Sequence, residues 1–273
     1  MAWLEALDKL SHWVYGDPAR CPLCFAPVSS GSPIPRGHPF SEHGRNAPVA
    51  GDAGIFTGIC SECTAQLAQQ MAWVCKVCGM PLRPPLELCN DCRLNMYYFD
   101  VQRSAGIYTG RLMSAIRRMK YSGERWLSRP LGRLLSQVAR QLSHEFSPVG
   151  LVVPVPLSRS SLKARGYNQA KDLAAEVSSN IRVPLADILE REEARGSQAR
   201  LSRRDRWRNL RGTMSVSGGS RLAGVSVLLV DDVATTGATL DEAARALKSA
   251  GAAEVLCVTL ARTMPYPSTR EEG

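Results

Sequence analysis

Residues 225–239 have the sequence VSVLLVDDVATTGAT, which passes from an apolar segment through two carboxylates into a loop rich in threonine and glycine. A short Val/Leu run bounded by turn residues predicts an interior strand of a parallel sheet, covered on both faces. Its last residues lie at the carboxyl end of the strand, where open α/β sheets bind their ligands. The segment therefore predicts an α/β fold and the position of a binding site within it.

The loop after this strand is predicted to bind a phosphate group. Its donors precede a predicted helix over residues 240–247, and they are Thr235, Thr236, Gly237 and Thr239. A helix N-terminus carries unpaired N–H groups and a positive dipole, which suit a phosphate monoester. Thr239 with Glu242 resembles a capping box, and Gly251 suits the C-terminal cap. The alternative is an ordinary strand, turn and helix with solvated polar residues.

Residues 229–239 resemble the phosphoribosyl-pyrophosphate (PRPP) signature of type I phosphoribosyltransferases. In that family the adjacent acids hold the ribose 2′- and 3′-hydroxyls, and the Thr/Gly loop holds the 5′-phosphate. The resemblance thus assigns Asp231 and Asp232 to the sugar, and carboxylates do accept hydrogen bonds from a diol but repel phosphate. It assigns the following residues to PRPP binding: Ala234, Thr235, Thr236, Gly237, Ala238 and Thr239. The family more often has a larger aliphatic residue at the position of Ala234.

Length and composition indicate a globular protein. The 273 residues allow one large or two modest domains, and 44% hydrophobic with 22% charged residues is an ordinary composition. No apolar run approaches the roughly 18 residues of a membrane helix. Residues 1–13 lack the basic start and small-residue cleavage site of a secretion signal. We therefore expect a cytoplasmic protein without membrane insertion.

Eight of the nine cysteines fall in four C-x-x-C units. These units are Cys21/Cys24, Cys60/Cys63, Cys75/Cys78 and Cys89/Cys92. Two such knuckles complete the tetrahedron of thiolates that Zn²⁺ prefers, so we expect two zinc ions. Spacing favours pairing the first knuckle with the second and the third with the fourth, while a crossed arrangement stays open. Four thiolates leave no position for water, so both ions are predicted to be structural.

Other interpretations of the cysteines are less favoured. A redox pair would be a single C-x-x-C that opens a helix after a strand, rather than four units in tandem. His38 and His43 lie between the first two knuckles and are alternative metal ligands, although a surface loop is the favoured interpretation. Cys257 stands alone in an apolar run, which predicts a buried thiol.

Charge divides the chain near residue 100. Residues 1–100 contain seven Lys/Arg and nine Asp/Glu, whereas residues 101–273 contain twenty-seven and sixteen. We predict a double zinc-ribbon domain with an N-terminal helix over residues 1–100 and a phosphoribosyltransferase-like domain over residues 101–273. A polyanion is expected to meet the basic second domain first, although zinc ribbons are commonly associated with nucleic acid.

Strands and helices alternate in the second part of the chain. We expect strands over residues 103–108, 150–156 and 225–230, and helices over residues 110–119, 127–142, 170–177 and 240–247. This alternation is typical of a parallel sheet with helices on both faces.

A basic segment over residues 158–169 follows the strand that ends in Pro-x-Pro. It is predicted to be a loop that binds pyrophosphate, and its cations are Arg159, Lys163 and Arg165. A solvated basic loop is the alternative. A second Arg-rich segment, residues 191–211, contains eight arginines and three acids. Its predicted roles are a lid over pyrophosphate, a track for a nucleic-acid strand, or a solvated helix face.

Several segments together resemble the ComF/GntX family of competence-associated, phosphoribosyltransferase-like proteins. They are residues 153–156, 165–170 and 201–210 and the four cysteine knuckles, which match the double zinc ribbon of that family. The resemblance covers nearly the whole chain and implies PRPP binding with Mg²⁺. It also implies handling of single-stranded DNA during uptake, with partners such as a helicase of the competence machinery.

The resemblance leaves two function classes. In an active transferase, the bond to pyrophosphate breaks ahead of attack, so a departing polyanion must be stabilised. The candidate catalytic residues are Asp231, Asp232 and Arg165, and the acceptor is a nucleobase, an amine or a nucleic-acid end. The alternative is a non-catalytic protein that senses PRPP or binds single strands and has retained the pocket. The sequence predicts neither the acceptor nor the oligomeric state.

Overall fold

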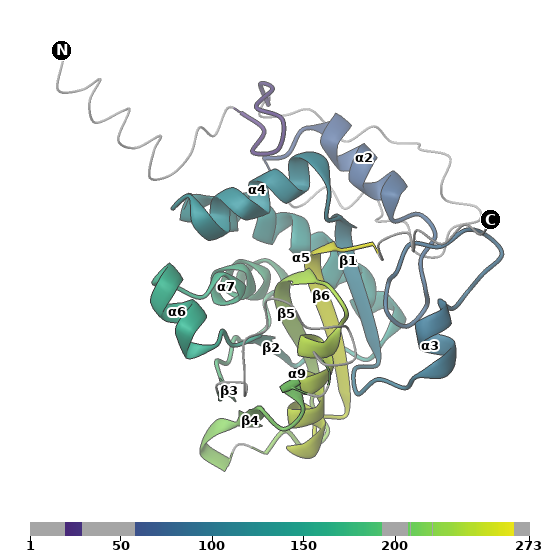
Figure 1. Ribbon diagram of the computed structural model, residues 1–273, viewed down its shortest axis with the longest axis vertical. Coiled ribbons are helices and arrows are strands. Elements are labelled where there is room, and N and C mark those ends of the chain that lie inside the picture. Colours follow the sequence, from purple (N-terminus) through teal and green to yellow (C-terminus); the bar gives the residue numbers. More distant parts are fainter. Residues whose placement is uncertain (1–19, 29–57, 193–206, 208, 220, 265–273) are drawn as a thin grey trace, which may run out of the picture.

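A four-stranded parallel sheet forms the centre of the molecule, and its strand order is β1-β6-β5-β2 (Figure 1). The computed structural model describes residues 20–28, 58–192, 207, 209–219 and 221–264. The strands are β1 (Val101–Ile107), β2 (Leu151–Pro154), β5 (Ser226–Ala234) and β6 (Glu254–Arg262). The predicted α/β fold with a parallel sheet is confirmed, and each predicted strand is present.

Helices cover both faces of this sheet. The principal ones are α4 (Gly110–Tyr121), α5 (Ser128–Glu145), α7 (Gln169–Ile181) and α9 (Ala238–Ser249). Alternate side chains of β5 enter two buried clusters, because successive residues of a strand face opposite sides. Leu228 and Val230 pack with α4, α5 and α7, whereas Val227 and Leu229 pack with α9. A single turn, η1 (Arg125–Leu127), leads into α5.

The predicted basic loop over residues 158–169 is wrong in part, because it contains the short helix α6 (Arg159–Arg165). Ser158 caps this helix by accepting a hydrogen bond from the Ser161 backbone N–H at 3.2 Å. Gly166 ends it with φ 76°, a left-handed conformation that favours glycine. Serine before and glycine after a short run were therefore the local signals for the helix.

A small antiparallel pair lies beyond the main sheet. It consists of β3 (Leu189–Arg191) and β4 (Met214–Val216), and β4 is followed by the turn η2 (Ser217–Gly219). Most of the Arg-rich segment, residues 193–206 and 208, lies outside the described residues. The expected N-terminal helix, His38 and His43 also lie outside them.

The cysteine-rich part packs directly on the sheet. Its helices α2 (Ser61–Gln70) and α3 (Asn90–Leu94) begin immediately after Cys60 and Cys89. Cys63 and Leu67 share a buried cluster with Val101 of β1. The division into domains at residue 100 stays a prediction. Among the described residues, no helix has the length and apolar character needed to cross a membrane.

Candidate functional site

The loop between β5 and α9 has the conformation expected of an anion-binding turn. β5 ends at Ala234, and Gly237 is the N-cap of α9 with φ 84°. A left-handed residue at this position favours glycine, which has no side chain to cap the helix. The Thr236 hydroxyl accepts a hydrogen bond from the Ala238 N–H at 3.3 Å. The first turn of α9 therefore presents backbone N–H groups that an anion can bind.

The predicted capping box is wrong, because α9 begins at Ala238 and Thr239 already lies inside its first turn. Glu242 is buried, and its carboxylate accepts from the Met214 N–H at 3.1 Å and pairs with Arg245 at 2.7 Å. This glutamate therefore fixes β4 against the helix. Gly251 follows the C-cap with φ 99°, as its predicted role at the helix end requires.

The two acids lie inside β5 rather than beyond its end, and they have different environments. Asp232 is buried, and Lys120 of α4 donates to its Oδ1 from 2.7 Å. Gln169, the first residue of α7, donates to its Oδ2. Asp231 is partly exposed, and its Oδ1 accepts from the Asp232 N–H at 2.8 Å. Within the described part of the chain, side chains thus donate to Asp232 but not to Asp231.

Although Asp231 is partly exposed, the surrounding protein desolvates its carboxyl group and raises its pKa to about 7; the negative charge of Asp232 adds to this increase while Lys120 opposes it. Near neutral pH this side chain therefore exchanges between an acid and a carboxylate. Such a group accepts a hydrogen bond from a hydroxyl in its ionised form and donates one in its neutral form.

Lys120 and Gln169 were missed by the sequence interpretation. Lys120 ends an amphipathic helix and looks like one more solvated cation, and Gln169 follows the polar residues that precede α7. The Tyr167 hydroxyl donates to the Met119 carbonyl, which fixes the end of α4 next to the start of α7. Only this long-range packing identifies both residues as partners of Asp232.

The three predicted pyrophosphate ligands all lie on α6, near the carboxyl ends of adjacent strands. β2 and β5 are parallel neighbours, so α6 and the phosphate loop follow the same edge of the sheet. Arg159 and Lys163 are exposed and one turn apart. Arg165 donates to the Tyr121 hydroxyl at 3.2 Å, and its guanidinium lies 5.1 Å from that ring centroid.

A cavity of about 440 Å³ adjoins α6. Its polar lining includes Arg125, whose guanidinium lies 5.0 Å from the centroid of the Tyr167 ring. The two carboxylates of this cavity are already paired, since Asp172 binds Arg125 and Asp187 binds Lys171 at 2.8 Å. The cavity therefore combines aromatic and cationic groups with little free negative charge.

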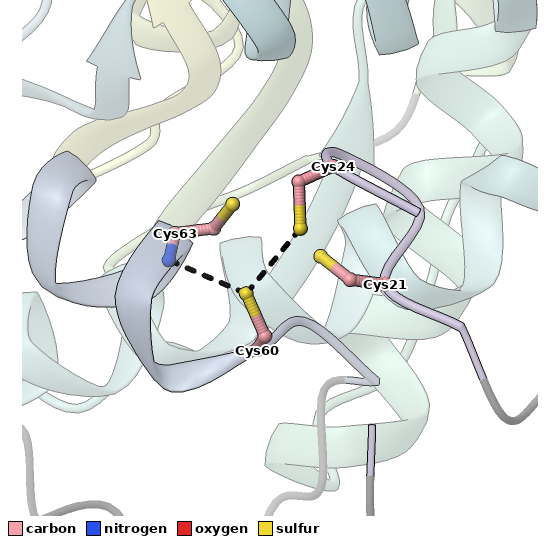
Figure 2. A group of neighbouring side chains, drawn as sticks. All are labelled: Cys21, Cys24, Cys60 and Cys63. Atoms are coloured by element: carbon pink, nitrogen blue, oxygen red, sulfur yellow. Dashed lines mark hydrogen bonds between the residues drawn. The ribbon is translucent and has the colours of Figure 1, made fainter. Parts of the chain in front are cut away.

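The eight paired cysteines form two quartets, and in each of them the four sulfur atoms lie within 4.8 Å of one another. The outer quartet is Cys21, Cys24, Cys60 and Cys63, and the inner quartet is Cys75, Cys78, Cys89 and Cys92. Figure 2 shows the outer quartet with its sulfur atoms directed toward one another. The favoured pairing of knuckles is confirmed, and the crossed arrangement is excluded.

The chemistry of both quartets fits a metal ion. Backbone N–H groups donate to the sulfurs, for example Cys92 to Cys89 Sγ at 3.5 Å. The hydrogen bond with Cys75 raises the pKa of Cys78 to about 12, because thiols this close cannot all ionise alone. A divalent ion such as Zn²⁺ would stabilise all four thiolates together.

Residues 161–272 match the family model described as the phosphoribosyl transferase domain. The chain is 32% identical to Competence protein F of Haemophilus influenzae over 75% of this chain and 90% of that protein. The chain belongs to the competence protein F family. Within this family it is also 30% identical to DNA utilization protein YhgH of Salmonella typhimurium, over 76% and 91% of the two chains. It is 26% identical to Competence protein ComFC of Bacillus subtilis, over 75% and 84%.

Solved structures give a weaker comparison. A purine phosphoribosyltransferase from Pyrococcus horikoshii aligns with 54% of this chain and 95% of its own, at 18% identity and a TM-score of 0.31. That similarity is too low to support an argument about function. The family match and the parallel sheet together identify a competence-related, phosphoribosyltransferase-like member of the competence protein F family, with cysteine quartets that fit zinc ribbons.

Proposed function

We propose that the protein binds PRPP with Mg²⁺ at the edge of the sheet where β5 meets α9. The observation that carries this proposal is the start of α9, where the N-cap residue is the left-handed Gly237 and supplies no side-chain cap. The 5′-phosphate would accept hydrogen bonds from the first N–H groups of α9 and from the hydroxyls of Thr235 and Thr236. Ala234, Ala238 and Thr239 complete the turn around it.

The two acids have separate roles in this proposal. Asp231 accepts hydrogen bonds from the ribose hydroxyls, because it is partly exposed and, among the described residues, only the Asp232 backbone N–H donates to it. Asp232 is a positioning residue, since Lys120 and Gln169 already engage both of its oxygens. Together these contacts attach the carboxyl end of β5 to α4 and α7.

Phosphoribosyl transfer to an acceptor is the reaction that such a site supports. Breaking the C1–O bond leaves a pyrophosphate anion and a sugar with oxocarbenium character, so the protein must stabilise the anion and exclude water. Bound Mg²⁺ would neutralise part of the pyrophosphate charge. Arg159 and Lys163 contribute further positive charge from α6, and a guanidinium such as that of Arg165 binds phosphate in bidentate fashion.

Calorimetry with PRPP, with and without Mg²⁺, tests the binding site. We expect Gly237→Ala and Asp231→Asn each to weaken binding at least tenfold, which corresponds to about 1.4 kcal/mol. Glu254→Gln is the matched control, because this acid lies at the opposite end of the same sheet and accepts from Ser226 at 3.0 Å. Equal affinity in all four proteins would refute the site.

Turnover separates the two function classes. Release of pyrophosphate from PRPP with a nucleobase, an amine or a nucleic-acid end would support an active transferase. Binding of PRPP without release for any acceptor would support the non-catalytic, PRPP-sensing alternative instead. Association with competence-machinery proteins such as a helicase remains a prediction.

Binding of single-stranded DNA is a second candidate function. The supporting observation is the pair of arginine–tyrosine contacts beside α6, Arg165 with Tyr121 and Arg125 with Tyr167. Tyr121 is 66% exposed, so a base can stack on it. We expect log K to fall with log salt by about 0.7 for each phosphate neutralised. Tyr121→Ala should weaken binding, whereas Tyr98→Ala should not, because this exposed tyrosine lies outside the arginine–tyrosine contacts and its backbone N–H donates to Asp241 of α9.

A further inference from the structure

Arg262, the last residue of β6, is a buried cation without a carboxylate partner in the described part of the chain. Only 1% of this residue is exposed. Its Nη1 donates to Gln102 Oε1 at 2.9 Å, and its Nε has no hydrogen-bond acceptor among the described residues. Because an isolated charge is costly to bury, the arginine requires a source of negative charge nearby.

The polar groups that hold the guanidinium are neutral. Gln102 donates from Nε2 to Ser104 Oγ at 2.7 Å and to Thr259 Oγ1 at 3.1 Å. Ser104 and Thr259 are themselves hydrogen-bonded and buried. This network holds the side-chain oxygen Oε1 of Gln102 toward Arg262, but it supplies no negative charge.

The inner cysteine quartet lies on the other side of Gln102. The Gln102 N–H donates to the Val77 carbonyl at 2.8 Å. A Cβ added to Gly79 would lie 3.2 Å from Gln102 Oε1 and 2.5 Å from the Gln102 carbonyl oxygen. The turn that contains Cys78 is therefore packed against the same amide that accepts from Arg262.

A metal-loaded quartet would carry net negative charge, because four thiolates outweigh one divalent ion. We propose that the metal-loaded inner quartet is the counter-ion of Arg262, so that the buried arginine and the metal centre stabilise each other. Arg262 then acts as a positioning residue in the outer sphere of the metal. It also pairs in register with Ala234, which precedes the phosphate loop. Through Arg262, the inner quartet is therefore connected to the end of the sheet that carries the candidate site.

The outer quartet has a different kind of cationic neighbour. Arg111 Nη1 lies 3.7 Å from Cys63 Sγ, but the side chain of Arg111 is 52% exposed and also lies 3.7 Å from Glu62. Water and salt screen such a charge. Arg111 is therefore a matched control for Arg262. Both arginines lie near a quartet of cysteines, but Arg111 is exposed to solvent whereas Arg262 is buried.

The test measures zinc release from the full-length, zinc-loaded protein after addition of a chelator. We expect Arg262→Met to accelerate the loss of one of the two ions about tenfold or more, as other outer-sphere substitutions do. Arg262→Lys keeps the charge and should restore most of the wild-type rate. Arg111→Met should have a small effect on the other ion, and this effect should disappear at high salt. Cadmium NMR of the ¹¹³Cd-loaded variants, with one resonance for each quartet, identifies the ion affected.

Two results would overturn the proposal. One is an unchanged release rate in Arg262→Met, and the other is equal acceleration of both ions, which would indicate general loosening of the fold. If Arg262→Met does not fold, hydrogen exchange in cysteine variants that keep Arg262 supplies the test. Cys78→Ser should then reduce amide protection at the amino end of β1, around Gln102, and at the carboxyl end of β6, whereas Cys24→Ser should not. Equal losses of protection in both variants would contradict the pairing.

Discussion

Lys120 Nζ lies 2.7 Å from Asp232 Oδ1, and the two side chains are 12% and 5% exposed. The pair joins the end of α4 to the carboxyl end of β5, and Gln169 completes it from the start of α7. Three elements that meet at the candidate site are thus held by one buried carboxylate. The contact also explains why Asp232 is less able than Asp231 to receive a ligand.

Lys120→Met should destabilise the protein strongly. Removing one partner of a buried ion pair leaves the other charge without compensation, which typically costs about 3–5 kcal/mol. Urea denaturation measures the loss directly. Adding Asp232→Asn to this variant should recover part of it, since the buried charge is then gone. Lys171→Met breaks the exposed pair with Asp187 and should cost no more than about 1 kcal/mol. Equal losses in the two single variants would contradict the buried pair.

Stability should depend on pH through Asp231. Its pKa of about 7 in the folded state lies above its ordinary value of 3.8, so the folded state binds the proton more tightly. The resulting stabilisation is fully present below pH 3.8 and is lost as the pH rises toward 7. Asp231→Asn removes this proton equilibrium. The difference in unfolding free energy between wild type and variant should therefore change by up to a few kcal/mol between these limits. A difference that is constant with pH would refute the raised pKa.

Three strands of the main sheet and the metal quartets could be predicted because their signals are local, whereas β6 was recognised only as an apolar run around Cys257. Short apolar runs mark the strands, and each C-x-x-C unit carries its own geometry. The different environments of Asp231 and Asp232 could not be predicted from local signals, because Lys120, the cation that pairs with Asp232, is 112 residues away in sequence. β3 and β4 have only three residues each, which is too short for a periodic pattern. Arg262 has no sequence signal at all, because its role depends on a neighbouring cluster.

Gly106→Ala should loosen the contact between the cysteine-rich part and the sheet. An added Cβ would lie 2.5 Å from Leu67 Cδ2 of α2 and 2.9 Å from Leu112 Cδ2 of α4. Overpacking of this kind typically costs about 1–3 kcal/mol. Thermal unfolding measures the loss, and Leu67→Ala in the same chain should relieve the clash. If the double variant is less stable than the sum of the two single changes predicts, the clash is not the cause.

Metal removal should unfold the chain as one unit. Cys63 and Leu67 share a buried cluster with Val101, and Cys75 and Cys78 share the other cluster with Leu229. Because both quartets contribute to cores that the sheet also uses, loss of the ions exposes apolar surface on both parts at once. Calorimetry of the metal-loaded protein should give one transition, and chelation should shift all of it to lower temperature. A second transition that keeps its temperature after chelation would instead show that residues 101–273 fold independently, as the predicted domain division implies.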